Sequence, residues 1–95
     1  MRDLQQAFHY YHKMADLGNA TAQHMVGFMY ATGFGNVVPR DQAQALLYHT
    51  FAAHGADTAA EMTLGYRYLL GIGTEQKCTD AVYYYKNVAA KGKAQ

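Results

Sequence analysis

The chain repeats itself, and this repeat limits its fold more than any other feature. The segment GFMYATGFG at residues 27–35 returns as GYRYLLGIG at residues 65–73, 38 positions later. A second block occurs at residues 7–18, 44–55 and 81–92, each copy 37 positions after the previous one. Repeats of this length are typical of helical arrays, in which each unit buries its apolar face against the next unit. We therefore predict an all-α solenoid, an architecture that mostly binds other proteins.

The repeats divide the 95 residues into about two and a half units. Residues 1–18 are expected to be the second helix of an earlier repeat, and residues 19–55 and 56–95 to be two repeats within one solenoid. Stable solenoids usually need about three repeats with polar ends. We therefore expect a section of a longer array that packs against more repeats or another chain, or self-associates. Its first and last helices would then expose apolar stripes, formed by Tyr10, Tyr11 and Met14 and by Tyr84, Tyr85 and Val88.

Apolar residues at helical spacing predict five helices. The block that occurs three times predicts helices over residues 3–17, 41–54 and 79–91, and the other block predicts helices over 20–32 and 58–70. In the middle copy of the first block, the apolar stripe is expected to be Gln44, Leu47, Tyr48 and Phe51.

The ends of these helices carry residues that favour caps. Asp41 is a natural N-cap for the second copy of the block, and Thr79 or Asp80 for the third. Each copy ends at a glycine, which tolerates the left-handed conformation after a helix: Gly18, Gly55 and Gly92. The two loops that lead into the second and third copies are expected to differ by one residue.

The other block has glycines in the middle of its helices. Gly27 and Gly65 each cost about 1 kcal/mol relative to alanine, so their repetition indicates that a neighbouring helix approaches closely there. Gly33 and Gly71 are expected to end these helices, and two further glycines continue the turn. The packing stripes of this block are Ala22, Val26 and Tyr30 in its first copy and Ala60, Leu64 and Tyr68 in its second. The two glycines that continue the turns are Gly35 and Gly73.

Composition and motifs argue against several classes of function. A formal net charge of +1 gives no electrostatic reason to expect nucleic acid or an anionic membrane, and no run of about 18 apolar residues is present to span a bilayer. Cys78 is the only cysteine, so an internal disulfide is impossible. His9 and His12 have a metal-ligand spacing without a third ligand. No cofactor motif or catalytic constellation can be assembled, so we predict no cofactor, no metal and no enzyme.

Two kinds of candidate site remain. Asn19-Ala20-Thr21 is an N-glycosylation sequon in a predicted turn, although Asn19 also suits the N-cap of the next helix. A partner-binding surface is expected on the first helix of each repeat, formed by residues outside the packing stripe: Gln23, Met29, Thr63, Tyr66 and Arg67.

The repeated positions resemble the Sel-1-like repeat, an α/α-solenoid unit related to the tetratricopeptide repeat. The second repeat matches that family's pattern at Ala60, Leu64, Gly65, Tyr68, Gly71 and Gly73, followed by Ala81, Tyr84, Tyr85, Val88, Ala89 and Gly92. The first repeat departs mildly, with Val26 for leucine and Gln44 for alanine.

A finer resemblance is to the eukaryotic branch that serves as the lumenal adaptor of a ubiquitin ligase in endoplasmic-reticulum-associated degradation. It rests on residues 42–51 and 64–73 and on Cys78 followed by Ala81. This resemblance implies a membrane-anchored parent protein in the lumen of the endoplasmic reticulum. It also implies two partners, the membrane subunit of the ligase and glycoprotein-recognising lectins. The alternative is a Sel-1-like scaffold for a signalling or envelope complex in another compartment.

Overall fold

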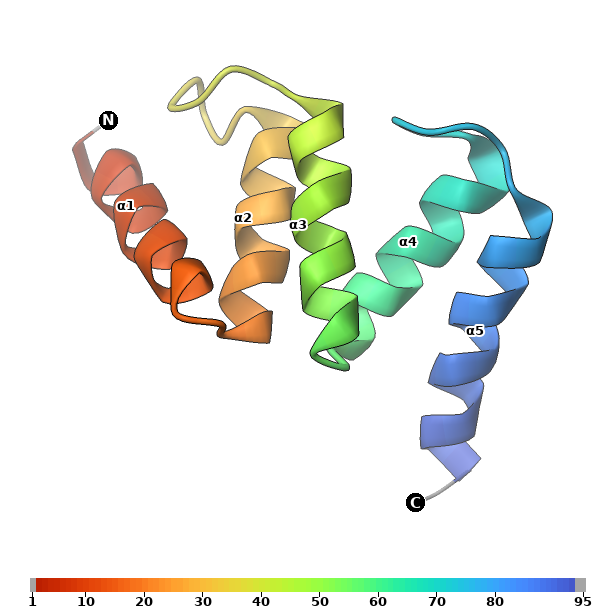
Figure 1. Cartoon of the computed structure of the whole chain (residues 1–95). Coiled ribbons are helices and arrows are strands. Elements are labelled where there is room, and N and C mark those ends of the chain that lie inside the picture. The colour runs from red at the N-terminus through yellow and green to blue at the C-terminus, as the bar shows by residue number, and fades with distance from the viewer. Residues whose placement is uncertain (1, 94–95) are drawn as a thin grey trace.

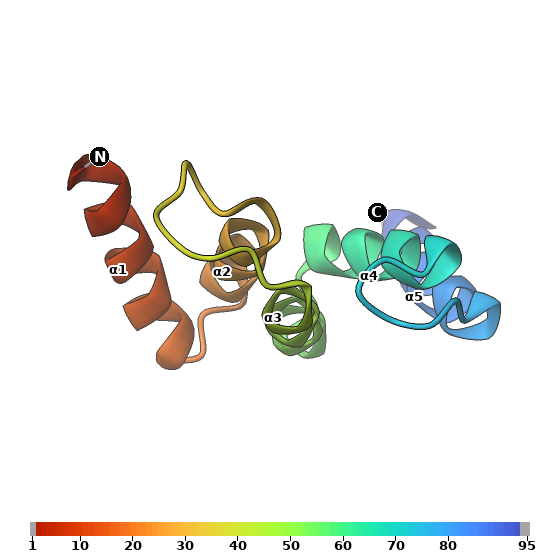
Figure 2. The same ribbon diagram turned by 90° about the horizontal axis from the view of Figure 1, so that it is seen from above.

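The computed structural model describes residues 2–93, which form five helices and no strand (Figure 1). Each helix packs mainly against the helices before and after it in the chain. Figure 2 shows them following one another along one direction, as a solenoid requires. The predicted all-α class is confirmed. The helices are α1 (Arg2–Asp16), α2 (Ala20–Thr32), α3 (Gln42–His54), α4 (Thr58–Leu70) and α5 (Cys78–Lys93).

The core consists of two clusters that repeat the same packing. In the first, Ala22 and Val26 of α2 pack with Ala15 of α1, and in the second, Ala60 and Leu64 of α4 pack with alanines of α3. The apolar stripes predicted for α2 and α4 are therefore buried as expected. None of the helices in residues 2–93 combines the length and apolar character needed to cross a bilayer.

The second helices of the two repeats are 36 residues apart, whereas the sequence pattern suggested 37. α3 begins at Gln42 and α5 at Cys78. Two stacked ring pairs show the same spacing, because their members from α3 and α5, Tyr48 and Tyr84, are 36 residues apart. Tyr30 lies 5.8 Å from Tyr48 at an interplanar angle of 21°, and Tyr68 lies 6.0 Å from Tyr84 at 3°. The connection after α4 is thus two residues shorter than the connection after α2. The sequence pattern had predicted a difference of one residue.

The same shift explains why the stripe predicted for α3 is wrong. Leu47 and Phe51 are each 44% exposed, and the buried positions of α3 are Ala45, His49, Ala52 and Ala53. The pattern had aligned Gly18 with Gly55, but the left-handed residues of the two turns are Gly18 (φ 93°) and Ala56 (φ 64°).

Gly55 has φ −85°, so its role is not the left-handed conformation. A Cβ there would lie 2.8 Å from the Cβ of Ala20, which shows that close packing requires this glycine. Gly92 is not a cap either, because it lies within α5. Gly33 (φ 78°) and Gly71 (φ 73°) end α2 and α4 as predicted.

The N-cap predictions have a mixed outcome. Asp41 caps α3, since its Oδ1 accepts a hydrogen bond from the backbone N–H of Gln44 at 3.0 Å. Neither Thr79 nor Asp80 caps α5, because the helix has already begun at Cys78. The structural equivalent of Asp41 in the shorter connection is Lys77, whose carbonyl accepts from Ala81.

The mid-helix glycines are where aromatic rings of the next helix sit. A Cβ on Gly27 would lie 2.8 Å from the imidazole of His49, and a Cβ on Gly65 would lie 2.9 Å from the ring of Tyr85. Distances this short mean that a side chain at either glycine would have to displace the neighbouring ring. The close approach inferred from the repeated glycines is thus confirmed.

We expect Gly65→Leu to lower the free energy of unfolding by roughly 1–3 kcal/mol, the usual penalty for overpacking. Gly92→Leu is the matched control, because Gly92 is also helical and no atom lies within 4 Å of its added Cβ. Urea titration of both variants measures the difference. Equal denaturation midpoints for the two variants would contradict the close-packing account.

The end helices expose fewer of the predicted residues than expected. Tyr10 is 61% exposed, but Tyr11 and Met14 pack against the α1–α2 cluster. On α5 the large exposed apolar residues are Val82 and Tyr83 in place of the predicted three. By the spacing of 36, Val82 is equivalent to Leu46, which packs into the α3–α4 cluster.

Candidate protein-interaction surface

An apolar stripe runs along the exposed face of α4. Met62, Tyr66, Leu69 and Leu70 are spaced at i, i+4, i+7 and i+8, which places them on one side of the helix. Their exposed fractions range from 41% to 54%. We call these four residues the α4 stripe. Grouped exposed apolar side chains are typical of interaction sites, whereas isolated ones are common on any surface.

The first repeat carries only part of this feature. Phe28 on α2 is the equivalent of Tyr66, 38 residues earlier, and is 48% exposed. The positions equivalent to Met62 and Leu69 hold His24 and Ala31. Both repeats therefore present an aromatic ring at the same position, while the full stripe belongs to the second repeat.

The residues predicted to bind a partner fall into three groups. Tyr66 is exposed and belongs to the α4 stripe. Gln23 and Thr63 are partly buried and bond to backbone carbonyls, Gln23 to Ala15 at 3.2 Å and Thr63 to Ala59 at 2.8 Å.

Met29 is fully buried and Arg67 is 6% exposed, so the prediction that they contribute to a surface is corrected. Both face the interior because they lie one turn after the core residues Val26 and Leu64. The other members of the α4 stripe were missed by sequence reasoning. They are the large apolar residues of this helix that do not belong to its packing stripe. That property could have identified them from the sequence.

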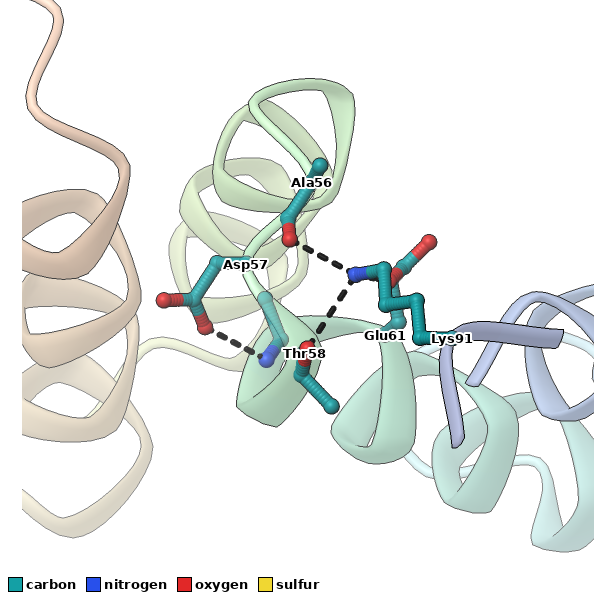
Figure 3. Close-up of polar contacts among 6 residues, drawn as sticks. Ala56, Asp57, Thr58, Glu61 and Lys91 are labelled. Carbon is teal, nitrogen blue, oxygen red and sulfur yellow. Dashed lines mark hydrogen bonds and ion pairs between the residues drawn. The ribbon is translucent and has the colours of Figure 1, made fainter. Parts of the chain in front are cut away.

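A buried ion pair ties α5 to the start of α4 (Figure 3). Glu61 is 5% exposed and pairs with the ammonium group of Lys91. The same ammonium donates to the carbonyl of Ala56 at 2.7 Å and to Oγ1 of Thr58 at 3.1 Å. One cation thus satisfies a buried carboxylate and a carbonyl in the turn between α3 and α4, holding the helix that carries the stripe.

A histidine pair joins α2 to α3. Nδ1 of His24 and Nδ1 of His49 lie 3.0 Å apart, so one must donate and the other accept. His49 is 2% exposed, and burial lowers its pKa to about 3, with smaller contributions from His24 and Arg67. Burial also lowers the pKa of His24, although the negative charge of Asp57 partly offsets this by raising it. Both rings are therefore neutral at pH 7 and contribute to packing.

A chain of polar contacts connects α1 to α3. Nδ1 of His12 lies 3.3 Å from a carboxylate oxygen of Asp16, and its Nε2 lies 3.2 Å from the hydroxyl of Tyr48. Burial raises the pKa of Tyr48, with further contributions from Tyr30 and Asp16. The hydroxyl therefore keeps its proton and is a poor nucleophile. Within residues 2–93, no three histidine, cysteine or acidic side chains group as metal ligands would.

Asn19 is exposed at the start of α2. Its Oδ1 accepts a hydrogen bond from the backbone N–H of Ala22 at 2.8 Å, so the side chain is the N-cap. The equivalent residue before α4 is Asp57, whose Oδ1 accepts a hydrogen bond from the backbone N–H of Ala60 at 2.9 Å and so caps α4.

A family model described as Sel1 repeat matches residues 1–19, 20–57 and 58–93. The human protein sel-1 homolog 2 is 40% identical over 89 residues, which cover 94% of this chain and 13% of that protein. The ERAD-associated E3 ubiquitin-protein ligase component HRD3 of Candida glabrata is 33% identical over 86 residues, covering 87% of this chain and 10% of that protein. The chain thus spans only a small part of these relatives.

Solved structures agree with this assignment. A Sel1 repeat protein from Oxalobacter formigenes superimposes with a TM-score of 0.84 at 31% identity, covering 90% of this chain and 35% of that one. A protective antigen of uropathogenic Escherichia coli superimposes with a TM-score of 0.86 at 28% identity, covering 93% of this chain and 18% of the antigen. With its three matched repeats and its row of paired helices, the chain belongs to the Sel1 repeat family of protein-interaction scaffolds.

Proposed function

We propose that this chain is a non-catalytic section of an adaptor for a ubiquitin ligase in endoplasmic-reticulum-associated degradation. The observation that carries the scaffold part is the α4 stripe, an apolar surface presented by a helix whose other faces are packed. The degradation part is supported by the 33% identity to HRD3 of Candida glabrata, an ERAD-associated ubiquitin ligase component.

The surface of the described residues fits a role in binding. The hollows on the described residues are shallow and lie over surface side chains such as His9 and Tyr10 or the loop around Pro39. His49, whose pKa burial lowers, is enclosed by packing and lines neither of these two hollows. A binding role uses the exposed apolar groups that the described residues present, above all the α4 stripe.

The proposed partner is another protein, namely the membrane subunit of the ligase, and the proposed compartment is the lumen of the endoplasmic reticulum as part of a membrane-anchored parent. Glycoprotein-recognising lectins are proposed as further partners of that parent. A Sel1 scaffold serving an envelope or signalling complex is the second candidate, since a solved structure with the same fold is a bacterial antigen.

We expect Tyr66→Ser to weaken co-purification of the ligase membrane subunit with the parent protein at least about tenfold. That loss corresponds to about 1.4 kcal/mol, modest for an interfacial tyrosine. The melting temperature should stay unchanged, because Tyr66 is 54% exposed. Tyr83→Ser on α5, at 59% exposure, is the matched control and should bind normally. Equal binding by both variants would show that the α4 stripe is not part of the interface. Absence of the ligase from the wild-type complex would refute the degradation role.

A further inference from the structure

The sequon Asn19-Ala20-Thr21 is the one motif in the chain that the scaffold function leaves unused. We infer that Asn19 is the acceptor of an N-linked glycan, a site that rests on the proposed lumenal location. Asn19 and Thr21, the two residues that define the motif, are both exposed. Asn19 ends the turn between α1 and α2, and Thr21 lies in the first turn of α2. This turn is at the edge of the solenoid opposite the long connections (Figure 1).

The cap geometry of Asn19 leaves the reacting atom free. Oδ1 accepts from Ala22, while Nδ2 makes no hydrogen bond to any residue in the described range 2–93. Glycosylation joins C1 of the first N-acetylglucosamine to Nδ2. The C1–O bond to a lipid-diphosphate-linked oligosaccharide breaks, its electron pair leaves with the diphosphate, and Nδ2 loses one proton. Oδ1 is untouched, so the modified side chain still caps α2.

The second repeat supplies an internal comparison. Asp57 holds the equivalent position and makes the same cap, so capping alone does not require an asparagine. Asparagine and aspartate are about equal as N-caps, but only asparagine accepts a glycan. The pairing of an asparagine cap with a hydroxyl residue two positions later is therefore the feature that distinguishes the first turn chemically.

The surface beside Asn19 offers a place for the first sugars. A shallow, largely apolar hollow of about 260 Å³ is lined by Tyr10, Tyr11, Met14, Asn19, Thr21 and Ala22. Tyr10 is 61% exposed there. Aromatic rings pair an apolar face with a polar edge, a combination that suits the apolar face and hydroxyl groups of a sugar ring. We assign this hollow to the core sugars of the Asn19 glycan, which cover the apolar surface that α1 otherwise exposes.

The test directs the chain into the secretory pathway of eukaryotic cells behind a cleavable signal, so that it does not depend on the native location. Wild-type chain and Thr21→Ser should show a mobility shift that endoglycosidase removes. Thr21→Ala, which keeps the cap, and Asn19→Asp, which copies Asp57, should not shift. A processed wild-type chain without a shift would overturn the acceptor assignment.

Two further readouts separate the parts of the inference. Tyrosine nitration should modify Tyr10 at least several-fold more slowly in the glycosylated chain than after deglycosylation, with Tyr83 unchanged as the control. Equal nitration of Tyr10 in both forms would overturn the placement of the sugars. The same endoglycosidase assay on the native parent protein tests the lumenal location: a chain glycosylated only behind the added signal would support the acceptor site and refute the proposed compartment.

Discussion

Replacing Lys91 by methionine is expected to lower the free energy of unfolding by about 3 kcal/mol. The substitution leaves the carboxylate of Glu61, only 5% exposed, without its cation. It also removes the donor to the carbonyl of Ala56. Breaking a buried pair from one side costs about 3–5 kcal/mol. We expect the lower end, because the Lys91 side chain is about a third exposed and solvent screens part of the interaction.

Denaturant titration measures this effect, and two other variants sharpen it. Lys86→Met removes an exposed lysine of the same helix and should change stability little. The double variant Glu61→Gln with Lys91→Met should recover part of the loss, because position 61 then carries no charge that needs a cation. If Lys91→Met were no more harmful than Lys86→Met, the pair would not hold α5 to α4.

Acidification is expected to destabilise the fold through His49. Its pKa is about 3 in the folded state, against 6.5 as its ordinary value. Because the folded pKa is the lower one, the stability held in the neutral ring is fully present above pH 6.5 and is lost as the pH falls toward 3. Each pH unit in that window costs at most about 1.4 kcal/mol, so the loss reaches up to about 3 kcal/mol by pH 4.5.

Free energies of unfolding measured between pH 7.5 and pH 4.5 test this dependence. His49→Gln, which cannot take up a proton, should be less stable at pH 7.5 but should lose much less stability on acidification. His9→Gln is the control, since His9 is exposed and should leave the acid dependence intact. The same acid dependence in His49→Gln and the wild type would place the titrating group elsewhere.

The sequence predicted the number and type of the helices because glycines and alanines mark their positions. The left-handed caps at Gly33 and Gly71 and the close approaches at Gly27 and Gly65 followed from that pattern. These features depend on backbone geometry, which few residue types satisfy, and such positions are therefore visible in a single sequence.

The register of the second helices was not predictable in the same way. Aligning Gly55 with Gly92 gives a spacing of 37. However, Gly55 allows close packing against Ala20, whereas a Cβ added at Gly92 would meet no atom of another element within 4 Å. The two glycines look alike in the sequence and have different roles. The ring pairs Tyr30–Tyr48 and Tyr68–Tyr84 establish the spacing of 36 through contacts between helices. Such contacts can be identified only once the fold is known.

The candidate surface was predicted in part for a related reason. Tyr66 was recognised as lying outside the packing stripe, but Arg67 was not recognised as buried. Its guanidinium donates to the carbonyl of Ile72 at 3.3 Å, in the turn that follows α4. A charged residue is expected on the surface from its type alone, and only the turn explains why this one is enclosed.

Photo-crosslinking from the α4 stripe shows whether this surface contacts the ligase. A photoreactive phenylalanine analogue is placed at Tyr66 or, as the control, at Tyr83, in the parent protein within its native membranes. Both positions are exposed aromatic sites on neighbouring helices. We expect the analogue at Tyr66 to crosslink to the membrane subunit of the ubiquitin ligase and the analogue at Tyr83 not to do so. Crosslinks to that subunit from neither position, or equally from both, would contradict a scaffold that binds its ligase through the α4 stripe.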